Sequence, residues 1–89
     1  MAFVPYQIRY TKDALKALRK MPRNLAILVE GKISQLADGG NPLAGNIKKL
    51  QGRDGYRLRV GDYRVIYTID NGALIITIIK IGSRGDVYE

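Results

Sequence analysis

The sequence predicts an α+β domain in which a helical hairpin packs on one face of a mainly antiparallel sheet. Residues 12–37 carry apolar side chains at the spacing of two amphipathic helices. Residues 56–81 instead alternate polar and apolar side chains, or run apolar, as β-strands do. Two turn signals, Gly61-Asp62 and Asn71-Gly72, divide that half of the chain into three strands. With a strand near the N-terminus, the expected order of elements is β-α-α-β-β-β.

The first strand, Phe3 to Tyr10, is followed directly by a helix. Pro5 has no backbone N–H to donate, which indicates an edge strand or the first residues of a strand. Thr11 is the expected N-cap of the helix Lys12 to Met21, and Asp13 puts a negative charge in its first turn. The apolar stripe expected on this helix comprises Ala14, Leu15, Leu18 and Met21. A lysine stripe on another face comprises Lys12, Lys16 and Lys20, and it is either solvated surface or a contact with an RNA backbone.

The second helix is expected to follow at once, over Arg23 to Ala37. Pro22 ends the first helix and is suited to start the next, so the two helices form a hairpin. The run Asp-Gly-Gly-Asn-Pro at 38–42 ends the second helix. A loop is then expected over Asn41 to Gln51. The buried stripe expected on the second helix comprises Leu25, Leu28, Val29, Ile33 and Leu36.

The stretch Tyr56 to Ile69 predicts a β-hairpin with a two-residue turn at Gly61-Asp62. This turn places Arg59 directly opposite Arg64 on the neighbouring strand. Because side chains alternate between faces, the two strands have one apolar face and one basic face. The apolar face comprises Leu58, Val60, Tyr63, Val65 and Tyr67, whereas the basic face carries Arg57, Arg59 and Arg64.

The basic face predicts an anion site. Like charges directly opposite each other on neighbouring strands are destabilising. Arginine is also the side chain whose shape best matches a phosphate group. The alternative is a solvated polar face whose long side chains splay apart in water.

The last strand, Leu74 to Ile81, is apolar on both faces, which is typical of a central strand. With Asn71-Gly72 as its turn, Ile69 pairs with Leu74 and Tyr63 pairs with Lys80. The residues from Gly82 onward would then emerge beside the Gly61-Asp62 turn. This register brings Arg84 near Arg59 and Arg64, with Tyr88 close by. The place of the first strand in the sheet remains open.

Composition limits the possible chemistry. The 89 residues are enough for one domain, residues 1–89, with a modest core. The chain has no cysteine and no histidine, so it lacks zinc thiolates, the commonest metal ligand and the usual general base near neutral pH. The net charge of +7 favours nucleic acid or an acidic protein as partner, and a basic protein with no polyanion partner is the alternative.

No membrane segment or secretory signal is visible in the sequence. The longest apolar run, Ala73 to Ile79, is interrupted by Thr77 and is too short to span a bilayer. We therefore expect a soluble cytoplasmic protein with no membrane partner.

Four segments together resemble the RelE toxins of the RelE/ParE superfamily. They are Lys-Lys-Leu-Gln-Gly at 48–52, Tyr-Arg-Leu-Arg at 56–59, Asp-Tyr-Arg-Val-Ile-Tyr at 62–67 and Ile-Gly-Ser-Arg-Gly-Asp-Val-Tyr at 81–88. The resemblance covers nearly the whole chain and is specific from Lys48 onward. It implies the toxin of a type II toxin–antitoxin system, an mRNA interferase that enters the ribosomal A site and cuts the messenger. The implied partners are mRNA, the ribosome and a cognate antitoxin.

The resemblance also implies a mechanism and roles for individual residues. The 2′-hydroxyl of the RNA attacks the adjacent phosphate without a metal or other cofactor, leaving a 2′,3′-cyclic phosphate and a 5′-hydroxyl. Arg57 and Arg59 correspond to basic active-site residues, and Arg64 corresponds to the arginine that steadies the phosphate. Arg84 corresponds to the arginine near the leaving oxygen, and Tyr88 to the tyrosine that stacks on or orients a base.

Two departures from the family pattern and two lysines complete the expected site. Arg57 replaces a lysine and does not readily deprotonate, so its expected role is charge stabilisation. Ser83 stands where several relatives carry histidine or lysine, which puts an acid–base contribution there in doubt. Lys48 and Lys49 are expected to contact RNA or ribosomal backbone, with a solvated loop as the alternative.

The alternative functions are a ParE-like inhibitor of DNA gyrase and a non-catalytic RNA- or antitoxin-binding module.

Overall fold

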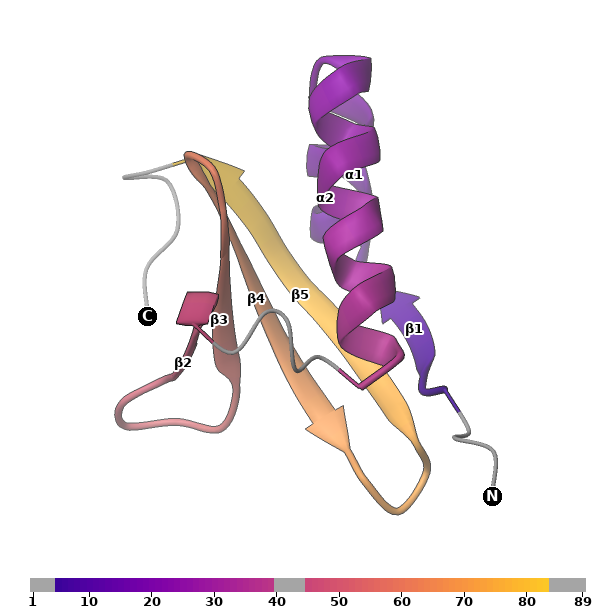
Figure 1. Cartoon of the computed structure of the whole chain (residues 1–89). Helices are drawn as coiled ribbons and strands as arrows, with labels where there is room; N and C mark the ends of the chain where they lie inside the picture. Colours follow the sequence, from indigo (N-terminus) through magenta and orange to yellow (C-terminus); the bar gives the residue numbers. More distant parts are fainter. Residues whose placement is uncertain (1–4, 40–44, 84–89) are drawn as a thin grey trace.

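The computed structural model describes residues 5–39 and 45–83, and it shows two helices packed on one face of a five-stranded sheet (Figure 1). The strand order is β1-β5-β4-β3-β2. All neighbouring strands are antiparallel except β1 and β5, which are parallel. The predicted α+β architecture is therefore confirmed. Within the described ranges, no helix is long and apolar enough to cross a membrane.

Strand β1, Gln7–Tyr10, lies at one edge of the sheet. Pro5 precedes it outside the hydrogen-bonded ladder, as its missing N–H requires. The partner of β1 is β5, with Gln7 opposite Ile75, which settles the position that the sequence left open. The predicted start of this strand at Phe3 lies outside the described residues.

Helix α1, Lys12–Lys20, begins as predicted, because the Thr11 hydroxyl oxygen accepts a hydrogen bond from the Ala14 N–H at 3.1 Å. Helix α2, Arg23–Ala37, follows after Met21 and Pro22. The two helices bury side chains of the predicted stripes against the sheet: Ala14, Leu18, Val29, Ile33 and Leu36.

The prediction that Leu28 belongs to the buried stripe of α2 is wrong. Leu28 is 47% exposed, next to Ile27, which is 59% exposed. The buried positions Val29, Ile33 and Leu36 follow the helical repeat, and Leu28 lies about 100° around the helix axis from Val29. The outer face of α2 therefore carries two exposed apolar side chains.

Strands β3, Tyr56–Val60, and β4, Tyr63–Asp70, pair in the predicted register. Arg59 lies opposite Arg64, and Val60 lies opposite Tyr63. Gly61 occupies the turn with a positive φ of 59°, a conformation that glycine adopts without steric cost. The predicted apolar face forms the centre of the core, since Leu58, Val60, Val65 and Tyr67 are all buried.

Strand β5, Ile75–Ser83, pairs with β4 in a different register from the one predicted. Ile69 lies opposite Ile76 rather than Leu74, and Tyr63 lies opposite Ser83 rather than Lys80. The first cause is a longer turn. Asp70 pairs with Ile75, and the Asp70 carboxylate accepts a hydrogen bond from the Ala73 N–H across that turn.

The second cause of the changed register is a β-bulge in β5. Tyr67 pairs with Ile78 and Ile66 pairs with Lys80, which leaves Ile79 as the extra residue. The helices cover only one face of the sheet, so Ile79 remains 37% exposed. The central position predicted for this strand is confirmed by the strand order.

The predicted loop over Asn41 to Gln51 contains a strand that sequence analysis missed. Strand β2, Ile47–Lys49, pairs with β3, so that Lys48 lies opposite Arg57. A strand of three residues shows too little alternation to be recognised, and its pairing with β3 is what makes it a strand. The Leu50 N–H donates to the Gly55 carbonyl at 3.0 Å and closes the connection to β3.

Candidate nucleic-acid interface

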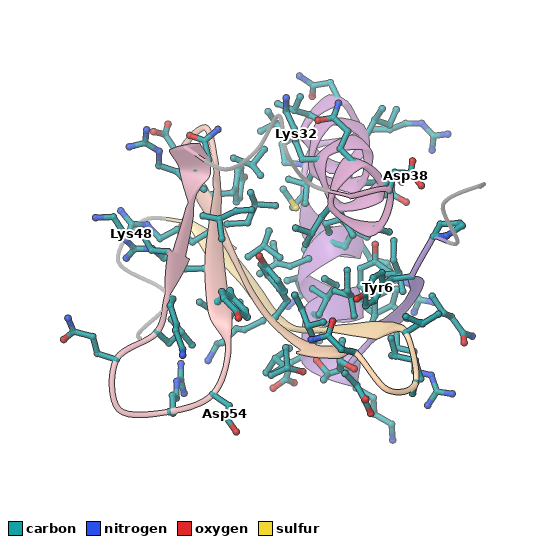
Figure 2. All side chains as sticks on the ribbon, turned by 60° about the horizontal axis from the view of Figure 1, so that its bottom comes forward. Tyr6, Lys32, Asp38, Lys48 and Asp54 are labelled. Carbon is teal, nitrogen blue, oxygen red and sulfur yellow. The ribbon has the colours of Figure 1, made fainter. Side chains whose placement is uncertain are left out.

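The face of the sheet that the helices leave uncovered carries a group of cations. We call this face the open face. Side chains alternate along each strand, so the residues directly before and after the buried Leu58 and Val65 point to this face. The basic cluster on it comprises Lys48 of β2, Arg57 and Arg59 of β3, and Arg64 of β4. Figure 2 shows Lys48 on the side of the sheet away from the two helices.

Strand pairing sets the spacing within the basic cluster. Lys48 pairs with Arg57, and Arg59 pairs with Arg64. Paired residues on neighbouring strands have Cβ atoms about 4.5–5.5 Å apart, and the strands themselves are about 4.8 Å apart. Lys48 and Arg59 are exposed, whereas Arg57 and Arg64 are half-buried. Their positive charges therefore add in a small region that is partly shielded from water.

Two shallow hollows lie between these side chains. The first has a volume of about 210 Å³ and is lined by Gly45, Asn46 and all four members of the basic cluster. None of the described residues lining it is acidic. The second has a volume of about 250 Å³ and is lined by Arg59, Gly61, Asp62 and Arg64. Arg59 and Arg64 thus border both hollows, and the Asp62 carboxylate borders only the second.

Two apolar side chains, Leu50 and Ile66, lie beside the basic cluster. Leu50 and Ile66 lie on the open face and are only 4% and 3% exposed, as a small cluster separate from the main core. Ile66 pairs with Arg57, so the apolar pair adjoins the basic cluster. This pair was not predicted from the sequence, although Leu50 lies two residues after Lys48 and so on the same side of the extended chain.

The structure separates the two neighbouring lysines that were expected to contact RNA. Lys48 belongs to the open face through its pairing with Arg57. Lys49 pairs with Tyr56 and points to the side on which the helices lie. Of the other candidate residues, Arg84 and Tyr88 lie outside the described residues. The last described residue, Ser83, lies opposite Tyr63, one position from Arg64.

The tyrosines of the hairpin belong to the core side. Tyr67 is 1% exposed and stacks on Tyr56, with ring centroids 5.5 Å apart and ring planes 21° apart. Burial, together with the neighbouring Tyr56, raises the pKa of Tyr67 to about 12. Tyr67 is therefore neutral near pH 7. The prediction that Tyr67 is a core residue is confirmed, and Tyr63 is half-buried against the same core.

The arrangement has the chemistry of a phosphate site. Guanidinium groups donate several hydrogen bonds in a fixed plane, and an oxyanion placed among them is stabilised by charge. All four members of the basic cluster are arginine or lysine, so what they offer a ligand is positive charge and hydrogen-bond donors.

Comparison with known proteins gives one consistent result. The family described as "ParE toxin of type II toxin-antitoxin system, parDE" matches residues 8–88. The chain is similar to Toxin RelG of Mycobacterium tuberculosis, with 33% identity over 97% of this chain and 99% of the relative. It is equally similar to Toxin RelE of the same organism, with 33% identity over 96% of this chain and 88% of the relative. The crystal structure of the archaeal RelE–RelB complex from Pyrococcus horikoshii matches with 31% identity and a TM-score of 0.79, over 94% of this chain and 100% of that chain.

Proposed function

We propose that this chain, which belongs to the ParE toxin family of type II toxin–antitoxin systems, is a ribosome-dependent mRNA endonuclease. One observation carries the proposal. Four cations from three neighbouring strands border a single hollow, and no described residue that lines it is acidic. Such a hollow suits the phosphodiester of an RNA strand in the ribosomal A site. The activity implies a cytoplasmic location.

A cognate antitoxin completes the proposed system. The archaeal relative is solved as a complex of RelE with RelB, which supports a partner of the same kind for this chain. The net charge of +7 favours an antitoxin with an acidic binding segment. An antitoxin that covers the open face would keep RNA from the basic cluster.

The proposed reaction is a transfer within the RNA strand. The 2′-oxygen forms a bond to the adjacent phosphorus, and the bond from phosphorus to the 5′-oxygen breaks. The 2′-hydroxyl loses its proton and the 5′-oxygen gains one, so the products are a 2′,3′-cyclic phosphate and a 5′-hydroxyl. The reaction consumes no cofactor or metal. Alignment of the attacking oxygen supplies up to about 7–11 kcal/mol of the required lowering of the barrier.

The basic cluster supplies the second contribution, which is charge. Negative charge builds up on the phosphate oxygens in the transition state, and preorganised cations stabilise that charge. Arg59 and Arg64, opposite each other, are placed to hold the phosphate from two strands. Arg57 contributes charge and donors rather than acting as a base, because a guanidinium does not readily deprotonate. In the proposal, Arg84 neutralises the leaving oxygen and Tyr88 orients a base.

Primer extension on a translated message tests this proposal. The wild-type chain is expected to produce defined cuts in the messenger within the ribosomal A site. Arg64→Ala and Arg84→Ala are expected to abolish these cuts while the proteins still fold and bind antitoxin. Equal cleavage by the variants would overturn the assignment of the site.

Inhibition of DNA gyrase is the second candidate function. It is favoured by the match to the ParE toxin family over residues 8–88. A supercoiling assay with purified gyrase separates the two functions, because an endonuclease leaves supercoiling unchanged at high excess. Normal cell growth during induced expression of intact protein would instead favour a non-catalytic binding module.

A further inference from the structure

A third hollow, larger than the two in the basic cluster, lies between α1 and the end of β5. It has a volume of about 470 Å³. Three lysines line it, and we call it the lysine groove: Lys16 and Lys20 of α1, and Lys80 of β5. Its other lining residues include the apolar side chains of Ala17, Met21, Tyr63 and Ile81, and one carboxylate, that of Asp13.

The topology of the sheet explains why this groove exists. β1 pairs with β5 only from Ile75 to Ile78. The chain then leaves the sheet at Thr11, whose N–H donates to the Ile78 carbonyl at 3.0 Å and whose hydroxyl donates to the Ile79 carbonyl at 2.7 Å. No strand of the described residues lies on this side of β5 from residue 80 to residue 83. The end of β5 therefore faces α1 across the groove.

The lysine groove is continuous with the basic cluster around the end of β5. Gly82 lines the groove and pairs with Arg64, which borders both hollows of the cluster. Gly82 has no side chain to separate the two surfaces. Lys80 pairs with Ile66, the apolar residue that adjoins Arg57, and it also lines the groove. One strand spacing, about 4.8 Å, separates the backbone of Arg64 from the backbone at the groove.

We propose that the lysine groove binds the sugar–phosphate backbone of the substrate RNA next to the phosphate that is cut. This inference rests on the proposed endonuclease function and names a further part of the same binding surface. Proteins commonly bind single-stranded nucleic acid in a positively charged groove that contains an aromatic side chain. Lys16 and Lys20 supply charge from α1, and Lys80, which pairs with Ile66 of the open face, supplies charge at the border between the two surfaces. The half-exposed ring of Tyr63 supplies the aromatic surface. Lysine side chains act as point charges and hold a backbone without regard to its sequence.

Binding of RNA that the protein cannot cut tests the inference apart from catalysis. The probes are a short and a longer single-stranded oligonucleotide with 2′-O-methyl groups throughout, which removes the attacking hydroxyl. Lys16→Ala/Lys20→Ala is expected to weaken binding of the longer probe and to leave the short probe unaffected. The slope of log affinity against log salt concentration is negative, and it should become less negative by about 0.7 for each lysine that no longer contacts a phosphate. Lys80→Ala should act in the same direction.

The matched control is Lys12→Ala/Arg19→Ala. It removes the same number of cations from the same exposed helix, at positions that do not line the groove. The control variant should therefore retain the affinity and salt slope of the wild type. Asp13→Asn, which removes the carboxylate from the groove, is expected to strengthen binding of the longer probe.

Three results decide between the possibilities. Equal affinities for the groove variant and the control variant would overturn the inference. Retained RNA binding together with lost binding to the acidic antitoxin would also overturn it, and would assign the groove to that protein. Weakened binding by the groove variant alone, in a protein whose wild type cuts no message, would support the groove as an RNA site and remove the endonuclease function.

Discussion

Arg59 and Arg64 lie directly opposite each other across the β3–β4 hairpin, on the open face of the sheet. Such a pair of like charges lowers stability in the free protein, by about 0.2–1 kcal/mol. The repulsion is relieved when an anion binds between them. The proposed phosphate site therefore has a cost in the stability of the free protein.

The first prediction follows from this repulsion. Arg59→Gln should raise the free energy of unfolding by a few tenths of a kcal/mol, up to about 1 kcal/mol, while it abolishes message cleavage. Urea unfolding at low and high salt measures the effect, because salt should stabilise the wild type more than the variant. Arg9→Gln is the control, since Arg9 is an exposed cation on β1 that pairs with Thr77. A loss of stability in Arg59→Gln larger than in Arg9→Gln would contradict this account.

The second prediction compares the two neighbouring lysines of β2. Lys48→Ala should reduce message cleavage about tenfold or more, because a charge-assisted contact with phosphate contributes about 1.5–3 kcal/mol. Lys49→Ala should have a smaller effect, since Lys49 pairs with Tyr56 and points away from the open face. Rates of cleavage on translating ribosomes measure the difference. Equal losses in the two variants would argue against the open face as the RNA surface.

The third prediction concerns two glycines in opposite surroundings. Gly55 has a φ of 126°, and an added Cβ would lie 3.0 Å from the Tyr67 carbonyl oxygen and 3.2 Å from Leu50 Cδ1. Gly55→Ala should lower the free energy of unfolding by about 1–3 kcal/mol. Gly31 lies inside α2 with nothing within 4 Å of an added Cβ, so Gly31→Ala should stabilise by about 0.5–1 kcal/mol. Denaturant unfolding of both variants should give shifts of opposite sign.

The fourth prediction tests the face of α2 that contacts the sheet. Leu36 is 8% exposed and Leu28 is 47% exposed. Leu36→Ala should cost about 2–5 kcal/mol, whereas Leu28→Ala should change stability by only about 0.5 kcal/mol. The same unfolding experiment measures both. Comparable losses in the two variants would mean that the free protein covers Leu28 after all.

The fifth prediction concerns alkaline pH. Tyr67 has its pKa raised from 10.0 to about 12, so the folded state keeps a proton that the unfolded state releases between these values. The contribution of Tyr67 to the free energy of unfolding should therefore be constant below about pH 10. It should fall by about 2–3 kcal/mol as the pH rises toward 12. Urea unfolding as a function of pH measures the slope. Tyr67→Phe should reduce this slope. Part of the slope should remain, because burial, and then the Glu30 carboxylate, also raise the pKa of Tyr10.

Several features follow from local sequence and were predicted correctly. The Gly61-Asp62 turn determines which residues of β3 and β4 face each other, so the Arg59–Arg64 pair follows from the order of residues alone. The start of α1 also depends on local groups, since the Thr11 hydroxyl oxygen accepts a hydrogen bond from the Ala14 N–H only three residues away. In both cases the interacting groups are close in sequence, and short-range geometry determines the outcome.

Other features depend on contacts between distant parts of the chain. The three residues of β2 become a strand only by pairing with β3, and this pairing also decides that Lys48 joins the basic cluster while Lys49 does not. The register of β5 could not be derived from its turn, because the bulge at Ile79 shifts the pairing in the middle of the strand. Leu28 shows the same limit, since helical spacing alone does not say which side of a broad apolar stripe meets the sheet.

The sequence by itself thus determined the order of the elements other than β2, the hairpin and its basic face, because periodicity and turn chemistry act over a few residues. Only the tertiary structure decided how far that basic face extends. It added Lys48 from one edge strand and joined Lys80 to Lys16 and Lys20 around the end of β5. The physical reason is that hydrogen-bonded pairing of strands, and the packing of α1 beside β5, bring together residues that no local rule relates.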